Sequence, residues 1–158
     1  MTIGFVTQYY AGLGHSQRIK FIAERVAKHE DVVIMDQLFK PPLKYDVPHV
    51  AFLEDYNPKD VSNMFKFVQH EDLLRYRIKR FINTIDKYKV KTLVVEGFPF
   101  CRHQFSHEYF SFFEEAKKRG IKLIISARDF PWDEPHQDSL QDWVAYTQNI
   151  VCKYYAEK

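Results

Sequence analysis

The 158 residues suit one domain whose core needs neither disulfides nor a metal for stability. The 23 Lys and Arg residues against 21 Asp and Glu leave a net charge of +2, which is too balanced to predict nucleic-acid binding. Cys101 and Cys152 lie far apart, the N-terminus carries no signal-peptide pattern, and no apolar run reaches the roughly 20 residues of a membrane span. We therefore expect a reduced, cytoplasmic protein without a transmembrane segment.

A short apolar strand opens the chain and leads through a glycine loop into an amphipathic helix. The strand is Ile3–Val6, and the loop, Ala11-Gly12-Leu13-Gly14-His15, brings a histidine to the N-terminus of the helix. Exposed N–H groups and the helix dipole favour anions at such an end. The apolar stripe that faces a sheet at helical spacing consists of Ile19, Ile22, Ala23, Val26 and Ala27.

Strands and helices continue to alternate along the chain, which predicts an α/β fold with a doubly wound parallel sheet in a single domain, residues 1–158. A glycine at position 120 marks the end of one helix. The predicted elements, in chain order, are strand Val32–Met35, a proline-rich loop Gln37–His49, strand Val50–Leu53, a helix from Asn57 to about Lys87 with a break near His70, strand Thr92–Val95, a helix from Ser106, strand Ile121–Ser126, and a last helix opened by a capping box at Asp138–Gln141.

Three loops follow the carboxyl ends of predicted strands, and a parallel sheet brings such loops to one edge. The first carries His15, the second runs from Glu96 to His103, and the third runs from Arg128 to Asp133. Together they supply an imidazole, carboxylates, guanidiniums and aromatic rings. This set suits a site that binds a polar, ring-shaped or anionic molecule and moves a proton.

Each of these residues also has a structural interpretation. His15 can simply cap or pack beside its helix, and Glu96 can pair with an arginine. Arg128 and Asp129 can form an ion pair that anchors their loop, and Arg102 can lie on a solvated face. These alternatives stay open at the level of the sequence.

Three side chains near the start of the predicted helix from Ser106 could in principle ligate a metal. They are His103, His107 and Glu108, but their spacing matches no recognised metal site. We therefore predict no metal.

The three loops together resemble a known family. GLGH followed by Arg18, then EGFPFCRHQF, then SARDF, is similar to the N-terminal half of GT-B nucleotide-sugar glycosyltransferases, above all to a bacterial group of predicted glycosyltransferases related to the MurG type. The resemblance runs over nearly the whole chain and implies a Rossmann-like fold. Cys101 stands where the family usually has glycine, and His103 stands where a second basic residue is common.

The resemblance implies a site made of the same three loops. His15 is the candidate base on an acceptor hydroxyl, and Glu96 or Asp129 is the candidate to orient it. A nucleotide sugar enters as a substrate, so no cofactor is implied. The predicted substrate-binding residues are Gly12, Gly14, Arg18, Phe98, Phe100, Arg102 and Arg128.

Enzymes of this fold bind the donor largely with a second Rossmann-like domain, and the 158 residues contain no such C-terminal donor-binding domain. The resemblance therefore implies an acceptor-side half that needs a second domain, a separate subunit or a homo-oligomer. Peripheral membrane contact is compatible with it, and nucleic acid is not an expected partner. The alternative is a non-catalytic module of the same fold that binds a nucleotide, a sugar or a protein.

Overall fold

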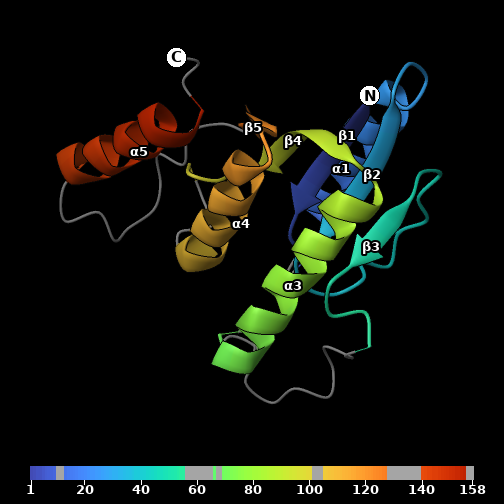
Figure 1. The fold of residues 1–158 in the computed structure, drawn as a ribbon, viewed down its shortest axis with the longest axis horizontal. Helices are drawn as coiled ribbons and strands as arrows, with labels where there is room; N and C mark the ends of the chain where they lie inside the picture. The colour runs from blue at the N-terminus through green and yellow to red at the C-terminus, as the bar shows by residue number, and fades with distance from the viewer. Residues whose placement is uncertain (10–12, 56–65, 67–68, 101–104, 128–139, 156–158) are drawn as a thin grey trace.

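The chain folds around one sheet of parallel strands in the computed structural model (Figure 1). The structure describes residues 1–9, 13–55, 66, 69–100, 105–127 and 140–155, without the side chains of 140–143. The order across the sheet is β3-β2-β1-β4-β5, and every neighbouring pair is parallel. The strands are β1 (Thr2–Thr7), β2 (Asp31–Asp36), β3 (His49–Ala51), β4 (Val90–Glu96) and β5 (Lys122–Ser126).

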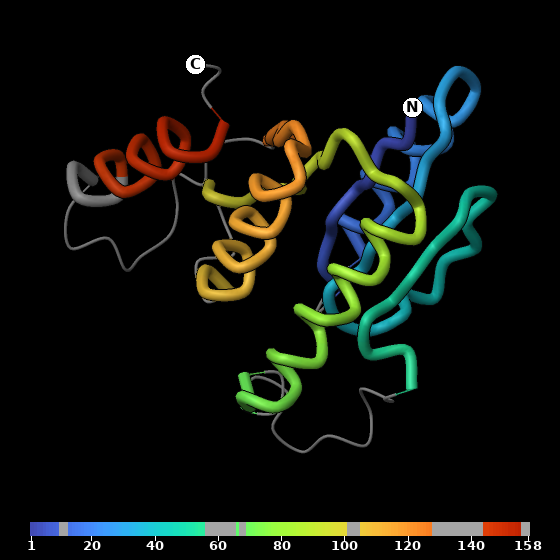
Figure 2. Tube along the Cα trace, in the orientation of Figure 1, coloured from blue at the N-terminus to red at the C-terminus, as the bar shows by residue number. Residues whose placement is uncertain are grey.

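Helices cover both faces of the sheet. α1 (Gly14–Val26) packs on one face, and α3 (Glu71–Lys87) and α4 (Ser106–Lys118) pack on the other (Figures 1 and 2). α5 (Leu140–Tyr154) lies beside α4, away from the strands (Figure 2). The chain leaves β1 toward β2 on one side and returns to β4 on the other, so the sheet is doubly wound. The predicted α/β, Rossmann-like fold is confirmed.

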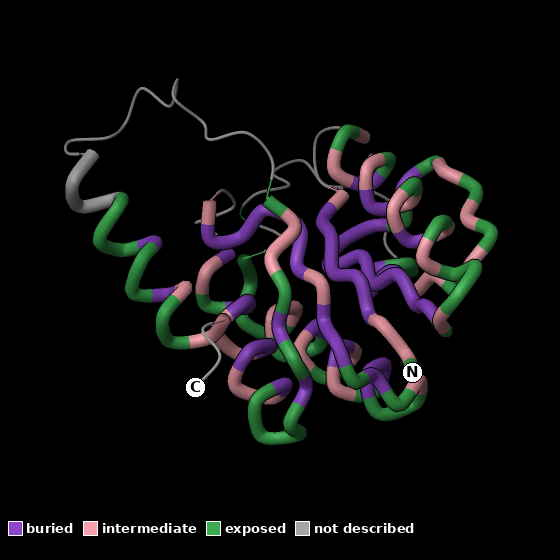
Figure 3. The backbone as a smooth tube through the Cα atoms, turned by 90° about the horizontal axis from the view of Figure 1, so that it is seen from above, coloured by how far each residue is buried: buried purple, intermediate pink, exposed green. Residues whose placement is uncertain are grey.

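Two apolar clusters fill the space between these layers, and Figure 3 shows the strands as the buried centre of the molecule. The smaller cluster joins Ile19 and Ala23 of α1 to alternate residues of β1 and β2. The larger one is rich in aromatic rings. Phe81 of α3 stacks on Phe112 of α4 with centroids 4.1 Å apart. Most of the chain's 14 phenylalanines therefore lie in the core or against it.

A buried ion pair ties α3 to α4 inside the aromatic cluster. Arg77 Nε and Nη2 donate to the two carboxylate oxygens of Glu108 at 2.7 Å and 3.0 Å, and both side chains are 1% exposed. Burial raises the pKa of Glu108 although the guanidinium opposes the shift. From the sequence, Glu108 was expected at the start of a helix and considered as a possible metal ligand, whereas the structure gives it a partner on another helix.

The element boundaries agree closely with the sequence patterns. Every predicted strand is present within two residues, and α3 begins at Glu71 because His70 is extended, at the predicted break. Gly120 has a φ of 65°, the left-handed conformation expected after a helix, and a side chain there would be strained. The segment from position 57 to 65 and the start of the predicted capping box at Asp138 lie outside the described residues. None of the helices in the described ranges has the length and apolar character needed to cross a membrane.

Candidate functional site

The candidate site lies at the carboxyl edge of the sheet between β1 and β4. These strands are neighbours, and the chain departs from them in opposite directions, which makes this the topological switch point, where doubly wound sheets bind ligands. β1 leads to α1, whose second residue is His15, and Glu96 is the last residue of β4. The topology thus brings together two side chains that are 81 positions apart.

His15 and Glu96 form a contact between an imidazole and a carboxylate. Nδ1 of His15 lies 3.2 Å from Oε1 of Glu96. Glu96 is 2% exposed, whereas the side chain of His15 keeps 21% of its surface accessible. Nε2 of His15 makes no hydrogen bond to any residue that the structure describes. A fixed carboxylate behind an accessible imidazole is the arrangement that orients a general base.

Arg18, one turn further along α1, holds Glu96 in place. Its Nη1 donates to both carboxylate oxygens of Glu96 at 2.9 Å, and its Nη2 donates to the carbonyl of Ala127 at 2.9 Å. The guanidinium therefore connects α1 to the ends of both β4 and β5. Among the described residues its contacts are with Glu96, Ser126 and Ala127, and its role in binding substrate stays a prediction.

Glu96 carries its charge despite its burial. Desolvation by burial would raise the pKa, but hydrogen bonds from His15, the Ser126 hydroxyl and Arg18 outweigh it, so the pKa lies below the ordinary 4.5. Gly97, with a φ of 80°, turns the chain directly after Glu96, and its N–H donates to the carbonyl of Ser126 at 3.0 Å. The structure thus places a rigid, negatively charged carboxylate behind His15.

The N-terminus of α1 adjoins this pair. Gly14 is the first helical residue, Leu13 makes no side-chain capping bond, and the first turn holds no acidic residue. Within the described residues no side chain caps this helix end, and Glu96 is held on the side of His15, so the free N–H groups of the first turn would favour an anion.

One predicted substrate-binding ring lies elsewhere. Phe98 is fully buried and stacks on Tyr109 of α4, with centroids 4.4 Å apart. Its apolar ring belongs to the larger core cluster, so as placed it offers no exposed surface to a ligand. Phe100 is half-buried, and its N–H donates to the carbonyl of Gly97 at 2.8 Å, which closes the turn.

Four predicted site residues lie outside the described residues: Gly12, Arg102, Arg128 and Asp129. Their roles remain predictions, including the placement of Arg128 at this edge. Within the described ranges, no group of three or more His, Cys, Asp and Glu residues is arranged to hold a metal ion.

A second polar group beside α1 was not expected from the sequence. Asp36, at the end of β2, is fully buried, and its Oδ1 accepts the N–H of Tyr9 at 2.6 Å. Its Oδ2 lies 3.6 Å from Nε2 of His49, whose ring stacks on Tyr45 at 4.3 Å. Burial raises the pKa of Asp36, and His49 and the Tyr9 N–H oppose that shift. Tyr9 lies just after β1, so Asp36 holds the chain where it leaves β1 toward α1.

Several polar atoms around Asp36 are buried and have no hydrogen-bond partner among the described residues. Each such atom costs about 1–3 kcal/mol if it stays unpaired, so ordered water is the ordinary partner to expect there. The sequence signal for this polar group was Asp36 itself, an acidic residue at the end of an apolar strand. The atoms are Thr7 Oγ1, Ser16 Oγ, Asp36 Oδ2, Tyr45 Oη and His49 Nε2.

No protein-family model matches the chain, and no curated protein matches it. Among solved structures, the C-terminal domain of a hydrogenase from Pyrococcus furiosus aligns with a TM-score of 0.54 and 12% identity, over 78% of this chain and 89% of that one. UDP-GlcNAc 2-epimerase from Methanocaldococcus jannaschii aligns with a TM-score of 0.47 and 13% identity, over 95% of this chain and 37% of that one. At these identities the likeness shows the fold alone. The chain is therefore a Rossmann-like α/β domain with an imidazole–carboxylate pair at its topological switch point.

Proposed function

We propose that this domain is the acceptor-side half of a glycosyltransferase, which moves a sugar from a nucleotide-sugar donor to a hydroxyl acceptor. The observation that carries the proposal is the 3.2 Å contact between Nδ1 of His15 and Oε1 of buried Glu96. It is supported by the resemblance of the GLGH and EGFPF loops, which supply these two residues, to the acceptor side of GT-B enzymes.

In the proposed step, His15 activates the acceptor. With a proton on Nδ1 donated to Glu96, Nε2 has a lone pair that can take the proton of the acceptor hydroxyl. The hydroxyl oxygen forms a bond to the anomeric carbon as the bond from that carbon to the diphosphate breaks. The electron pair of the broken bond leaves on the diphosphate oxygen, and the proton ends on His15. Glu96 then stabilises the imidazolium that has formed.

The departing diphosphate carries negative charge that must be stabilised. The uncapped N-terminus of α1 supplies one favourable electrostatic partner at this edge. Arg102 and Arg128 are proposed as further partners from the sequence resemblance. Asp129 remains the alternative to Glu96 as the residue that orients His15.

The donor is proposed to bind mainly to a second domain, in the same protein or in a separate subunit, facing the carboxyl edge of this sheet. The reaction as proposed uses no cofactor and no metal. A cytoplasmic location belongs to the same proposal, because nucleotide sugars are polar, charged substrates that an internal enzyme would meet in solution.

The test combines binding and transfer. A panel of nucleotide sugars is titrated by calorimetry into the chain alone and together with the product of the neighbouring gene, and sugar transfer is then assayed with the donor that binds. We expect His15→Ala to lower turnover by at least about tenfold, because a positioned base contributes about 10²–10⁴-fold. The matched control is His29→Ala, since His29 is exposed beyond the far end of α1.

Two results would contradict the proposal. Equal turnover of the His15→Ala and His29→Ala proteins would reduce His15 to a structural role. Donor binding without transfer to any hydroxyl acceptor would favour the alternative, a non-catalytic module that binds a nucleotide or a sugar.

A further inference from the structure

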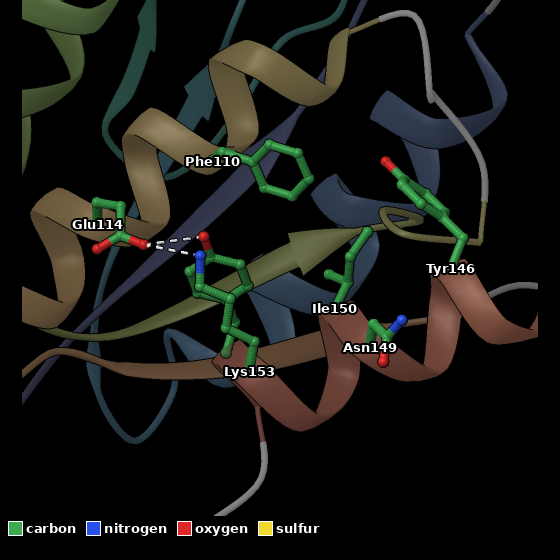
Figure 4. A pocket seen from close by; sticks show the side chains of 7 residues that line it. Phe110, Glu114, Tyr146, Asn149, Ile150 and Lys153 are labelled. Atoms are coloured by element: carbon green, nitrogen blue, oxygen red, sulfur yellow. Dashed lines mark hydrogen bonds and ion pairs between the residues drawn. The ribbon is translucent and has the colours of Figure 1, made fainter.

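A cleft of about 430 Å³ lies between α4 and α5 (Figure 4). α4 packs on the face of the sheet opposite α1, so the cleft is separate from the pair formed by His15 and Glu96. Its volume falls in the range of small-molecule sites, about 300–1,000 Å³. The residues that line it include Phe110 and Glu114 of α4 and Tyr146, Asn149, Ile150 and Lys153 of α5.

The cleft has firm apolar walls. Figure 4 shows the rings of Phe110 and Tyr146 flanking the hollow, with Ile150 between them. Phe110 packs edge-on against buried Phe98, with centroids 5.8 Å apart, and Ile150 belongs to the larger core cluster. The hydroxyl of Tyr146 lies 3.0 Å from Oγ of Ser106 on α4. These contacts fix the two rings before any ligand arrives, which lowers the entropic cost of binding.

The charged residues of the cleft are already paired with each other. Oε1 of Glu114 accepts the Tyr154 hydroxyl at 2.9 Å and lies 3.4 Å from Nζ of Lys153. The Tyr154 hydroxyl and Lys153 hold the pKa of Glu114 below its ordinary value, and contacts with Tyr154 and Glu114 raise the pKa of Lys153. Both groups are therefore charged at neutral pH and pair with each other.

One amide completes the set of polar groups. Asn149 lines the cleft next to Ile150 on α5, and no hydrogen bond of its side chain is recorded among the described residues. A carboxamide offers a donor and an acceptor together. It is thus suited to a ligand that carries hydroxyl groups on neighbouring carbons.

We propose that this cleft binds the ring of a neutral sugar. A pyranose ring has an apolar face of C–H groups, which can pack on the rings of Phe110 and Tyr146, and an edge of hydroxyl groups, which can bond to Asn149. A sugar acid or an amino sugar is disfavoured because Lys153 and Glu114 already neutralise each other. The added charge would have to displace one of them or remain unpaired.

The inference goes beyond the proposed function and does not depend on it. Binding in the cleft requires neither a nucleotide nor turnover, and His15 takes no part. The two proposals can therefore fail separately.

The experiment is an NMR titration of the ¹⁵N-labelled chain with methyl glucoside, methyl glucuronide and methyl glucosaminide. We expect saturable shifts of the amides of Tyr146, Asn149 and Ile150 with the neutral glycoside, at a dissociation constant on the order of 1 mM. The two charged glycosides should bind at least tenfold more weakly. Asn149→Ala should weaken binding of the neutral glycoside about tenfold or more. Asn83→Ala, a matched change on the exposed surface of α3, should leave it unchanged.

Three outcomes would overturn the proposal. The first is the absence of saturable shifts at the cleft, and the second is equal binding by the Asn149→Ala and Asn83→Ala proteins. The third is a set of cleft shifts that follow protein concentration without sugar, which would identify a second copy of the chain as the occupant. Far-UV circular dichroism of both variants verifies that each is folded.

Discussion

Loss of one partner of the buried ion pair between Arg77 and Glu108 should destabilise the fold strongly. Among the described residues, Glu108 is the side chain that pairs with the Arg77 guanidinium, which is 1% exposed and whose Nη1 makes no hydrogen bond there. Glu108→Ala removes this partner. Removing one partner of a buried pair costs about 3–5 kcal/mol, because the other charge is left without compensation. For a domain of this length, that loss lowers Tm by about 6–20 °C. Urea unfolding followed by far-UV circular dichroism measures the free energy directly.

Two further variants separate charge from packing. Glu71→Ala breaks a pair with Arg75 on the same helix, but both side chains are at least 70% exposed, so the loss should stay below about 1 kcal/mol. The double variant Arg77→Met/Glu108→Leu removes both charges and keeps apolar volume, so it should be clearly more stable than Glu108→Ala. If Glu108→Ala costs no more than Glu71→Ala, the reasoning from burial is refuted.

Four smaller predictions concern the site and the helix ends. The lowered pKa of Glu96 means that its stabilising contribution is complete above pH 4.5 and is lost as the pH falls through its folded value; Glu96→Gln should therefore flatten the acid side of the curve of stability against pH, and an unchanged curve would contradict this. The neutral ring of His15 should carry its proton on Nδ1, as ¹⁵N shifts of the ring nitrogens report, whereas a proton on Nε2 would disagree with the contact to Glu96. Asp36→Ala should reduce hydrogen-exchange protection of the Tyr9 amide about tenfold, since a buried donor left without its acceptor costs about 1–3 kcal/mol; equal protection would show that Asp36 does not hold this amide. Gly120→Ala should cost about 1 kcal/mol in urea unfolding and Gly120→Asn less, because asparagine tolerates positive φ, and equal costs would point to another cause.

The fold was predictable because its signals are local. Apolar runs of strand length that alternate with amphipathic stretches predict a parallel α/β sheet, and this pattern does not depend on contacts between distant residues. The break at His70 and the end of α4 at Gly120 were predictable for the same reason, since each depends on the conformation of one or two residues.

The contact between His15 and Glu96 was predictable by topology. Both follow the carboxyl ends of strands, and a doubly wound sheet brings such ends together. Pairing of Glu96 with an arginine was one alternative that the sequence left open, and Arg18 was expected at this edge as a residue that binds substrate. That Arg18 is the partner of Glu96, and that it also bonds to Ala127, follows only from the structure.

Other pairs could not be predicted, because polar partners on different elements leave no periodic trace. Arg77 and Glu108 are 31 residues apart on two helices, and each reads alone as a solvent-facing charge. The burial of Phe98 escaped prediction for a related reason. An aromatic residue in a loop after a strand fits either a ligand site or the core, and only the position of Tyr109 decides between them.

The contacts of Arg18 also explain how the Glu96 carboxylate can stay oriented and ionised beside His15. A carboxyl group as buried as Glu96 would by itself favour the neutral form, and a neutral Glu96 would stabilise an imidazolium poorly. Arg18 donates to both oxygens of Glu96 from α1, the helix that also carries His15. The first turn of α1 thus positions the His15 imidazole and, through Arg18, helps to hold Glu96 oriented and ionised. Since a base is effective only when its partner is both ionised and held in place, the guanidinium contributes to the proposed chemistry through Glu96, whether or not it also contacts a substrate.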